Sequence, residues 1–396
     1  MELQLALLAD RGRARVTGSN FLVRQYEETS RLAINHNYLA EQFGDYEEIF
    51  RKVAVLVEQG DYTLGRAVDD FEARYAEIAG TRFALGVGSG TDALFLSLKA
   101  LGVGPGDEVI TTPYTFFATI GAIVTAGAKP VFVDVKDDYN IDPTRIADAI
   151  TEMTKAIMPV HWSGHACDMD EIMAVADQHG VPVVEDACHG IKATYKGRPL
   201  GSFGATGCFS MHPLKNLNVW GDGGVIVTDD EALYTQLSLM RNHGLINRNE
   251  CSLFGYNSRL DTIQAIVANH MLDSIDSITA SRQKNSLYFD ERLAAISQIT
   301  VPDRDPEKQH VFHIYVVRVE QRDELQAFLI GSGVDAKIHY PIPMHLQPAA
   351  REFGYSKGDF PSAEAICASV ISFPVHEFIT QAQQDFVVDK INEFYG

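Results

Sequence analysis

The fold is predicted outward from one stretch of the chain, Cys208-Phe209-Ser210-Met211-His212-Pro213-Leu214-Lys215-Asn216. A glycine cluster (221–224) and a β-branched run (225–228) follow it. This order places Lys215 in a loop that leaves a buried strand. Partial removal from water there lowers the pKa of an amine and frees it as a nucleophile toward a carbonyl. Most lysines are solvated surface charges. The residues upstream are therefore needed to distinguish a reactive amine at Lys215 from an ordinary surface lysine.

Upstream of this stretch, short β-branched runs alternate with helical patterns. This alternation is typical of the α/β class, in which a mainly parallel sheet is covered by helices on both faces. In such sheets, ligands bind beyond the carboxyl ends of the strands. The predicted strands are 83–87, 108–111, 130–135, 156–160 and 181–186, and the predicted helices between them are 93–101, 117–126 and 168–179.

The chain is predicted to form two domains after an N-terminal extension. The extension is 1–35, the large domain is 36–270, and the small C-terminal domain is 271–396. Apolar spacing continues from Leu260 to Ile296, which predicts one long helix that joins the two domains. The other predicted elements are a helix at 46–59, a helix marked by Val68, Phe71 and Tyr75, strands at 311–319 and 335–340, and helices at 322–332 and 381–394.

Composition excludes several classes of function. The 396 residues are 46% hydrophobic and 22% charged, with a net charge of −20, so nucleic acid and anionic membranes are not expected partners. The five cysteines are odd in number and form no C-x-x-C pair, which predicts a reducing compartment and no zinc site. No apolar run approaches ~18 residues, and the N-terminus lacks the pattern of a signal peptide. We therefore expect a cytoplasmic protein.

Three further features are expected at the same sheet edge as Lys215. Ser89-Gly90-Thr91 stands where a strand turns into a helix, and backbone N–H groups at such a turn can bind phosphate. Asp186 ends an apolar strand, where a carboxylate is costly unless it meets a cationic partner. Phe116 follows another strand and can stack on a planar ring. Taken singly, each has an ordinary alternative: a plain strand–helix turn, a helix cap at Asp186, or core packing.

Together with Lys215, these residues meet the needs of pyridoxal 5′-phosphate. Its phosphate needs N–H and hydroxyl donors, its pyridine nitrogen needs an acidic partner, and its aldehyde needs a lysine amine for a Schiff base. Cys188 shares the strand face of Asp186, because side chains alternate with period two. His189 follows it and can hydrogen-bond a ligand oxygen. The sequence therefore predicts a cofactor site and no metal site.

The combination of motifs resembles a known family. The motifs are Gly60-Asp61-Tyr62-Thr63-Leu64-Gly65, Ser89-Gly90-Thr91-Asp92-Ala93-Leu94, Gly104-Pro105-Gly106-Asp107-Glu108-Val109-Ile110, Glu185-Asp186-Ala187-Cys188-His189, Ser210-Met211-His212-Pro213-Leu214-Lys215, Gly255-Tyr256-Asn257-Ser258-Arg259-Leu260-Asp261 and Ile338-His339-Tyr340-Pro341. They are similar to those of the DegT/DnrJ/EryC1/StrS sugar aminotransferases, within the aspartate-aminotransferase (type I) fold of pyridoxal-phosphate enzymes. The resemblance covers about residues 36–396. It implies a three-layer fold, with a mainly parallel central sheet in the large domain and a smaller α+β C-terminal domain.

The resemblance implies catalytic roles for three residues. Lys215 would form the Schiff base and then move the proton between the substrate carbon and the cofactor. Asp186 would pair with the pyridinium nitrogen, and His189 would lie against the phenolic oxygen of the cofactor. Phe116 would stack on one face of the ring, with Cys188 on the other.

The resemblance also implies the remaining contacts. Gly90, Thr91 and Ser210 would bind the cofactor phosphate. Asn257 would reach the phosphate from the neighbouring subunit, which implies a homodimer with shared active sites. The implied substrate contacts are Tyr62, Arg259, His339 and Tyr340.

The reaction that the resemblance implies is amino transfer in two stages, in amino-sugar biosynthesis. An amino acid, L-glutamate in the family, would convert pyridoxal phosphate to pyridoxamine phosphate. A keto sugar, linked to a nucleotide or a phosphate, or a cyclitol ketone, would then accept the amine.

Three alternative functions make different demands on the sequence. A sugar dehydratase on the same scaffold would carry histidine in place of Lys215. A non-catalytic, cofactor-binding regulatory module would need a DNA-binding segment, and the extension shows no helix-turn-helix pattern. A dinucleotide-dependent dehydrogenase would need G-x-G-x-x-G after a strand, and Gly86-Val87-Gly88-Ser89-Gly90 has the wrong spacing.

Overall fold

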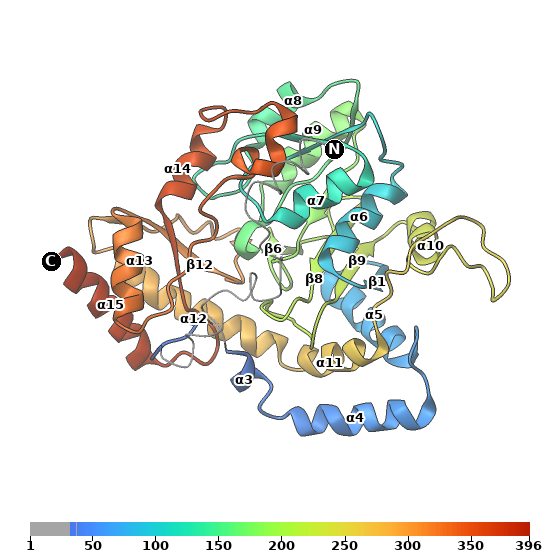
Figure 1. Cartoon of the computed structure of the whole chain (residues 1–396), viewed down its shortest axis with the longest axis horizontal. Helices are drawn as coiled ribbons and strands as arrows, with labels where there is room; N and C mark the ends of the chain where they lie inside the picture. Colours follow the sequence, from blue (N-terminus) through green and yellow to red (C-terminus); the bar gives the residue numbers. More distant parts are fainter. Residues whose placement is uncertain (1–31, 37) are drawn as a thin grey trace, which may run out of the picture.

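The computed structural model describes residues 32–36 and 38–396 (Figure 1). Most of the predicted extension therefore lies outside the described residues. Ile34, near its end, forms a parallel bridge to Val334 and is buried in the C-terminal core. The domain boundaries near 35 and 270 stay predictions. Every helix in the described part is too short or too polar to traverse a lipid bilayer.

The central sheet is mainly parallel, as predicted. Two isolated parallel bridges, Ile157 to Val183 and Val160 to Asp186, join a three-stranded and a four-stranded part. Neighbouring strands are parallel except at β9, which is antiparallel to both β8 and β1. The strand order is β3 (Lys129–Phe132), β2 (Glu108–Thr111), β4 (Thr154–Ile157), β5 (Val184–Asp186), β8 (Thr206–Ser210), β9 (Gly224–Thr228) and β1 (Phe83–Val87).

Helices cover both faces of this sheet, which makes three layers (Figure 1). Side chains alternate between two apolar clusters: Ala84 belongs to one and Leu85 to the other, and Ile226 points away from Val225 and Val227. The first cluster includes residues of α5 (Arg66–Ala79), α9 (Met169–His179) and α11 (Thr262–Leu272), and the second includes residues of α6 (Gly90–Ala100), α7 (Phe117–Ala126) and α10 (Glu231–Met240).

The C-terminal part has its own antiparallel sheet and apolar core. The sheet has the order β10 (Ile299–Thr300), β12 (Tyr315–Val319) and β13 (Val370–Phe373). Its core is shared with α12 (Ile275–Leu293), α13 (Arg322–Gly331) and α15 (Gln381–Tyr395). The remaining elements are α3 (Leu39–Gln42), α4 (Tyr46–Gln59), η3 (Pro143–Arg145), α8 (Ile146–Ala149), η4 (Trp162–Gly164), β6 (Thr194–Tyr195), β7 (Arg198–Pro199), β11 (Lys308–Gln309), η5 (Met344–Leu346), η6 (Pro348–Phe353) and α14 (Pro361–Ser369).

The prediction of one long helix from 260 to 296 was wrong. The structure has two helices, α11 and α12, with Asp273 and Ser274 between them. The N–H groups of these two residues donate to carbonyls three positions back, on His270 and Met271. This tighter turn interrupts the α-helix. The apolar spacing continues across it because Ile275 and Ile278, at the start of α12, pack in the same cluster as α11.

Five predicted strands are shorter than expected. The predicted strands 130–135, 156–160 and 181–186 are observed as Lys129–Phe132, Thr154–Ile157 and Val184–Asp186. The other two lie in the C-terminal part. Only Tyr315–Val319 of the predicted 311–319 strand pairs in a sheet. The predicted 335–340 strand is reduced to a single bridge between Lys337 and Ser372. In both segments, other hydrogen bonds replace the ladder: His313 N–H donates to the Ser163 carbonyl, and Asp335 N–H donates to the Ile34 carbonyl.

Candidate active site

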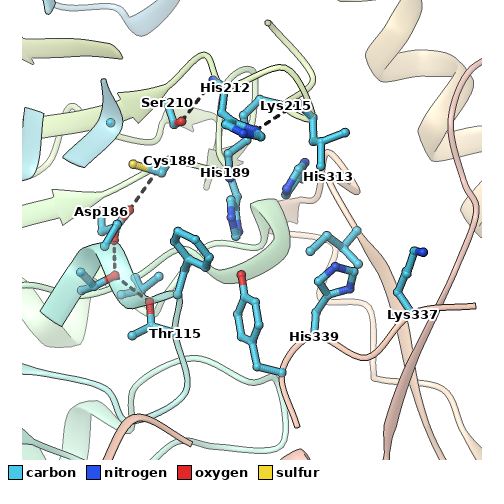
Figure 2. A pocket seen from close by; sticks show the side chains of 18 of the residues that line it. Thr115, Asp186, Cys188, His189, Ser210, His212, Lys215, His313, Lys337 and His339 are labelled. Carbon is cyan, nitrogen blue, oxygen red and sulfur yellow. Dashed lines mark hydrogen bonds between the residues drawn. The ribbon is translucent and has the colours of Figure 1, made fainter. Parts of the chain in front are cut away.

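A cavity of about 390 Å³ opens where the central sheet meets the C-terminal part (Figure 2). The ends of β5 and β8 and the start of α6 line one side of it, and the segment 335–340 lines another. Figure 2 shows Asp186 and Cys188 on one side, with His339 and Lys337 opposite. Most of the sequence-predicted site residues meet here: Gly90, Thr91, Phe116, Asp186, Cys188, His189, Ser210, Lys215, His339 and Tyr340.

Lys215 lies in the loop that follows β8, and its side chain lines the cavity. Removal from water lowers the pKa of its amine to about 8, although Cys188 and Asp186 act in the opposite direction. An amine with this pKa is partly uncharged near neutral pH, so it can attack a carbonyl. The prediction that Lys215 is partly desolvated is met by this position.

Asp186 ends β5 and is buried, and the hydrogen bonds to its carboxylate within the described residues come from neutral donors. The Thr119 hydroxyl donates to Oδ2 at 2.7 Å, and the Cys188 backbone N–H donates to Oδ1 at 3.2 Å. Thr119 uses its hydrogen toward Asp186, so Thr115, 2.7 Å away, donates to the Thr119 oxygen. A buried carboxylate held by neutral donors suits a cationic ligand group such as a protonated ring nitrogen.

His189 presents a donor to the cavity. The backbone N–H of Ser163 donates to its Nδ1 at 3.1 Å. A backbone N–H can only donate, so Nδ1 is the acceptor. Burial, with Lys215 and His339 adding to it, holds the pKa of His189 well below its ordinary value. The ring is therefore neutral, with its single proton on Nε2.

The start of α6 offers a cradle for an anion. Ser89 caps the helix by accepting the Asp92 N–H at 3.0 Å. A Cβ on Gly90 would lie 2.6 Å from the Ser210 Cβ and 3.1 Å from the Cys188 sulfur, so only glycine fits. The N-terminal N–H groups of the helix and the Ser210 hydroxyl line the same cavity. This arrangement suits a phosphate group.

Aromatic rings and histidines form the opposite wall. Phe116 is 48% exposed, and its ring lies 6.0 Å from that of Tyr340. The Tyr114 hydroxyl donates to the His339 carbonyl. Nδ1 of His313 is buried without a hydrogen-bond partner in the described part of the chain, and the residue lines the cavity. These groups leave room and polar contacts for a ligand beyond the cofactor.

Three predicted site residues lie away from this cavity. Tyr62 is half-exposed, and its hydroxyl is 3.5 Å from the Val57 carbonyl. Asn257 is exposed, and Arg259 donates to the Asn242 side chain at 2.9 Å. None of the three lines the cavity of a single chain.

Several residues at the site were not predicted. Thr115 and Thr119 approach Asp186 from the loop before α7 and from its first turns, and their four-residue spacing is the one sequence signal that could have pointed to them. No local pattern assigned a role to Ser163, His313 or Lys337. Their places depend on contacts between distant parts of the chain.

The family model for the DegT/DnrJ/EryC1/StrS aminotransferase family matches residues 45–392. The chain belongs to this family. The predicted resemblance is confirmed, and the protein is a pyridoxal-phosphate-dependent aminotransferase with the fold of that group.

Two relatives illustrate the family. This aminotransferase is 41% identical over 361 residues to the "Pleiotropic regulatory protein" of Geobacillus stearothermophilus, covering 90% of this chain and 97% of the relative. It is 38% identical over 354 residues to the dTDP-3-amino-3,4,6-trideoxy-alpha-D-glucose transaminase of Streptomyces venezuelae, covering 88% and 93%.

Solved structures agree with the fold and the cofactor. The aminotransferase superposes on S. venezuelae DesV, in complex with a ketimine intermediate, with a TM-score of 0.89 at 37% identity, covering 91% of this chain and 98% of that one. It also matches NtdA from Bacillus subtilis with bound pyridoxamine phosphate (PMP), with a TM-score of 0.83 at 30% identity, covering 88% and 82%. The cradle at Gly90, the carboxylate of Asp186 and the amine of Lys215 fit pyridoxal phosphate in one cavity.

Proposed function

We propose that this aminotransferase transfers the amino group of L-glutamate to a keto sugar, linked to a nucleotide or a phosphate, or to a cyclitol ketone. One observation carries the chemistry: the Lys215 amine, with its pKa lowered to about 8, lines the same cavity as the buried Asp186 carboxylate. The keto-sugar acceptor is supported by relatives named as sugar transaminases, which include a UDP-2-acetamido-2-deoxy-3-oxo-D-glucuronate aminotransferase of Pseudomonas aeruginosa.

Different residues of the cavity would bind different parts of the cofactor. The first N–H groups of α6, at Gly90 and Thr91, and the Ser210 hydroxyl would bind the phosphate. The Asp186 carboxylate would hold the proton of the ring nitrogen. Nε2–H of His189 would donate to the phenolic oxygen. The Phe116 ring would exclude water from the face of the cofactor.

When bound, pyridoxal phosphate supplies an aldehyde that binds amines and a ring that delocalises the electron pair released at the substrate carbon. Lys215 carries the proton. Its uncharged Nζ would take a proton from the substrate carbon and return it to the former aldehyde carbon of the cofactor. A pKa of about 8 suits this work, because the amine can hold or release a proton near neutral pH. His339 and Tyr340, on the opposite wall, would contact the acceptor.

The test starts with Lys215→Ala. We expect loss of the absorbance band of the bound cofactor and loss of turnover with L-glutamate. Lys196→Ala, which alters an exposed lysine paired with Asp170, serves as the control and should retain both. Normal turnover of Lys215→Ala would contradict the proposal.

Two further measurements separate this function from its alternatives. A wild-type half-reaction, in which L-glutamate converts the bound cofactor to its amine form, is expected of an aminotransferase, and its absence would favour a regulatory module. Keto sugars and cyclitol ketones should then return the cofactor to the aldehyde form. Release of a deoxygenated sugar in place of an amino sugar would instead identify a dehydratase.

We also propose that the protein is a homodimer with shared sites. Figure 1 shows the segment between α10 and α11 extending from the body of the molecule. Phe254 on this segment is 97% exposed and Ile246 is 57% exposed, so the segment carries apolar side chains that a second subunit would cover. Asn257 and Arg259 follow on the same segment, and we infer that they would complete the cavity of a partner subunit. The cytoplasmic location stays a prediction.

Mixed dimers test this arrangement. Lys215→Ala and Asn257→Asp should each be inactive alone. A mixed dimer of the two has one site with both native residues only if Asn257 acts across the interface. Random mixing of equal amounts should therefore restore about a quarter of wild-type turnover. No recovery after confirmed subunit exchange would place Asn257 outside the partner's site.

A further inference from the structure

The segment 310–313 is bonded to a tight turn next to the cavity instead of forming the start of β12. Val311 N–H donates to the Gly164 carbonyl at 3.2 Å, and His313 N–H donates to the Ser163 carbonyl at 3.0 Å. From the other side, the Arg282 guanidinium donates to the carbonyl of His313 at 3.3 Å. The segment is therefore fixed between α12 and the turn of η4.

The backbone conformation of this turn, at Ser163 and Gly164, is tightly restricted. Ser163 has a left-handed backbone, with φ of 57°, and is 3% exposed. A Cβ on Gly164 would lie 2.5 Å from a Val311 methyl group and 2.7 Å from the His189 carbonyl. A non-glycine residue with positive φ costs on the order of 1 kcal/mol, so the conformation of Ser163 depends on contacts that hold it.

His310 supplies such a contact. Its Nδ1 accepts the Phe312 N–H at 2.8 Å, so a neutral ring carries its proton on Nε2. That atom lies 3.2 Å from the Ser163 hydroxyl oxygen, to which it donates. The ring is buried and stacks on Phe312 at 3.9 Å and on His165 at 5.2 Å. Burial keeps the pKa of His310 well below its ordinary value, so the ring stays neutral and Nδ1 stays an acceptor for the Phe312 N–H.

The restricted backbone of Ser163 also fixes the hydrogen bonding of His189. Its N–H, held by the turn, donates to Nδ1 of His189 at 3.1 Å. His313, from the same segment, packs its ring against that of His189, with centroids 4.4 Å apart. Figure 2 shows His313 beside His189 at the cavity. One segment thus touches His189 twice, once through Ser163 and once through a ring.

We propose that His310, acting through Ser163, is a positioning residue that keeps the proton of His189 on Nε2. This inference rests on the proposed function, in which His189 faces the phenolic oxygen of the cofactor. With the proton on Nε2, His189 donates to that oxygen. With the proton on Nδ1, two lone pairs would face each other, and the cofactor would lose both a hydrogen bond and its preferred charge distribution.

The first experiment uses the full-length chain without cofactor, labelled with ¹⁵N in the histidine rings. Long-range ¹H–¹⁵N correlations distinguish the two neutral tautomers, and His189→Gln identifies the His189 signals. We expect the Nε2–H form in the wild type and a measurable fraction of the other tautomer in His310→Phe. His165→Phe is the matched control, because phenylalanine keeps a ring stacked on His310 and, in the described part of the chain, no hydrogen bond joins the His165 side chain to Ser163. It should leave His189 unchanged.

A second variant guards against misfolding of His310→Phe. Ser163→Ala removes only the hydroxyl that His310 binds and should shift the tautomer in the same direction, with native circular dichroism. An unchanged Nε2–H signal in both variants would overturn the proposal. The tautomer is read without cofactor or turnover, so its failure is separate from any failure of the amino-transfer assignment.

The third readout is the absorbance spectrum and the kinetics of the enzyme with bound cofactor. We expect the absorbance maximum of the bound cofactor to shift in His310→Phe and Ser163→Ala, and kcat to fall about tenfold while KM changes less than about twofold. A purely structural role would lower the melting temperature without moving the spectrum, and that result would also count against the proposal.

Discussion

The Asp186 carboxylate accepts a hydrogen bond from the hydroxyl of Thr119, a residue that no sequence motif identified. Thr119→Val removes the 2.7 Å donor to Oδ2 while keeping the shape of the side chain. A hydrogen bond to a charged group contributes about 1.5–3 kcal/mol, so we expect kcat to fall about tenfold or more. Steady-state kinetics at saturating substrates will measure the change.

Thr115→Val is the matched control for this prediction. It removes a hydroxyl whose one hydrogen bond among residues 32–36 and 38–396 is to Thr119, one step from the carboxylate, and should lower kcat less than Thr119→Val does. Equal kinetics for Thr119→Val and wild type would show that the carboxylate does not need this donor.

Lys215 gives a prediction on pH. An ordinary lysine amine has a pKa of 10.5, and removal from water lowers that of Lys215 to about 8. Only the uncharged amine attacks the cofactor aldehyde, so the rate of attachment should rise with pH and level off above about 8. Stopped-flow absorbance of the cofactor-free protein mixed with pyridoxal phosphate will follow it. A rate that still climbs tenfold per pH unit at pH 9.5 would contradict this environment.

At the scale of elements, periodicity predicted most helices and strands well. The helix at 46–59 and the strand at 83–87 have the predicted bounds. Periodicity failed where a local turn ends a helix, as at Asp273 and Ser274, and where tertiary hydrogen bonds replace a ladder, as before Tyr315. An apolar spacing records which side of the chain faces the core, and it does not record where the backbone hydrogen bonds go.

The junction of α6 with β8 gives a prediction at this scale. Gly90→Ala places a Cβ 2.6 Å from the Ser210 Cβ, so helix and strand must separate. We expect the free energy of unfolding to fall by about 1–3 kcal/mol, with weaker binding of the cofactor phosphate. Denaturant unfolding and cofactor titration will measure the two effects.

Gly121→Ala is the control for Gly90→Ala. This glycine lies inside α7 with open space around the added Cβ, so alanine should stabilise the helix by about 0.5–1 kcal/mol. Similar effects of the two substitutions would show that the cradle is looser than the structure indicates.

The whole molecule should lose stability in mild acid because several histidines are buried and neutral. Burial lowers the pKa to about 4 in His165 and His376 and to about 3 in His36 and His339, from 6.5. Below pH 6.5 the unfolded chain binds more protons than the folded one, so stability falls as the pH decreases toward 4.

The melting temperature between pH 7 and 5 will test this. His165→Phe removes one of these groups and should reduce the loss by on the order of 2 kcal/mol over the interval from pH 6.5 to 5. A melting temperature that stays constant over this range in the wild type would contradict the prediction.

The sequence by itself determined the α/β class and the family, and it predicted the cofactor residues that lie in motifs. Lys215, Asp186 and the Gly90 turn stand at strand ends, and strand ends can be read from local patterns. Only the tertiary structure decided which groups tune them. Thr119 lies 67 positions from Asp186, and His310 lies 147 positions from Ser163. Hydrogen bonds over such separations depend on how layers pack, and no local pattern encodes that packing.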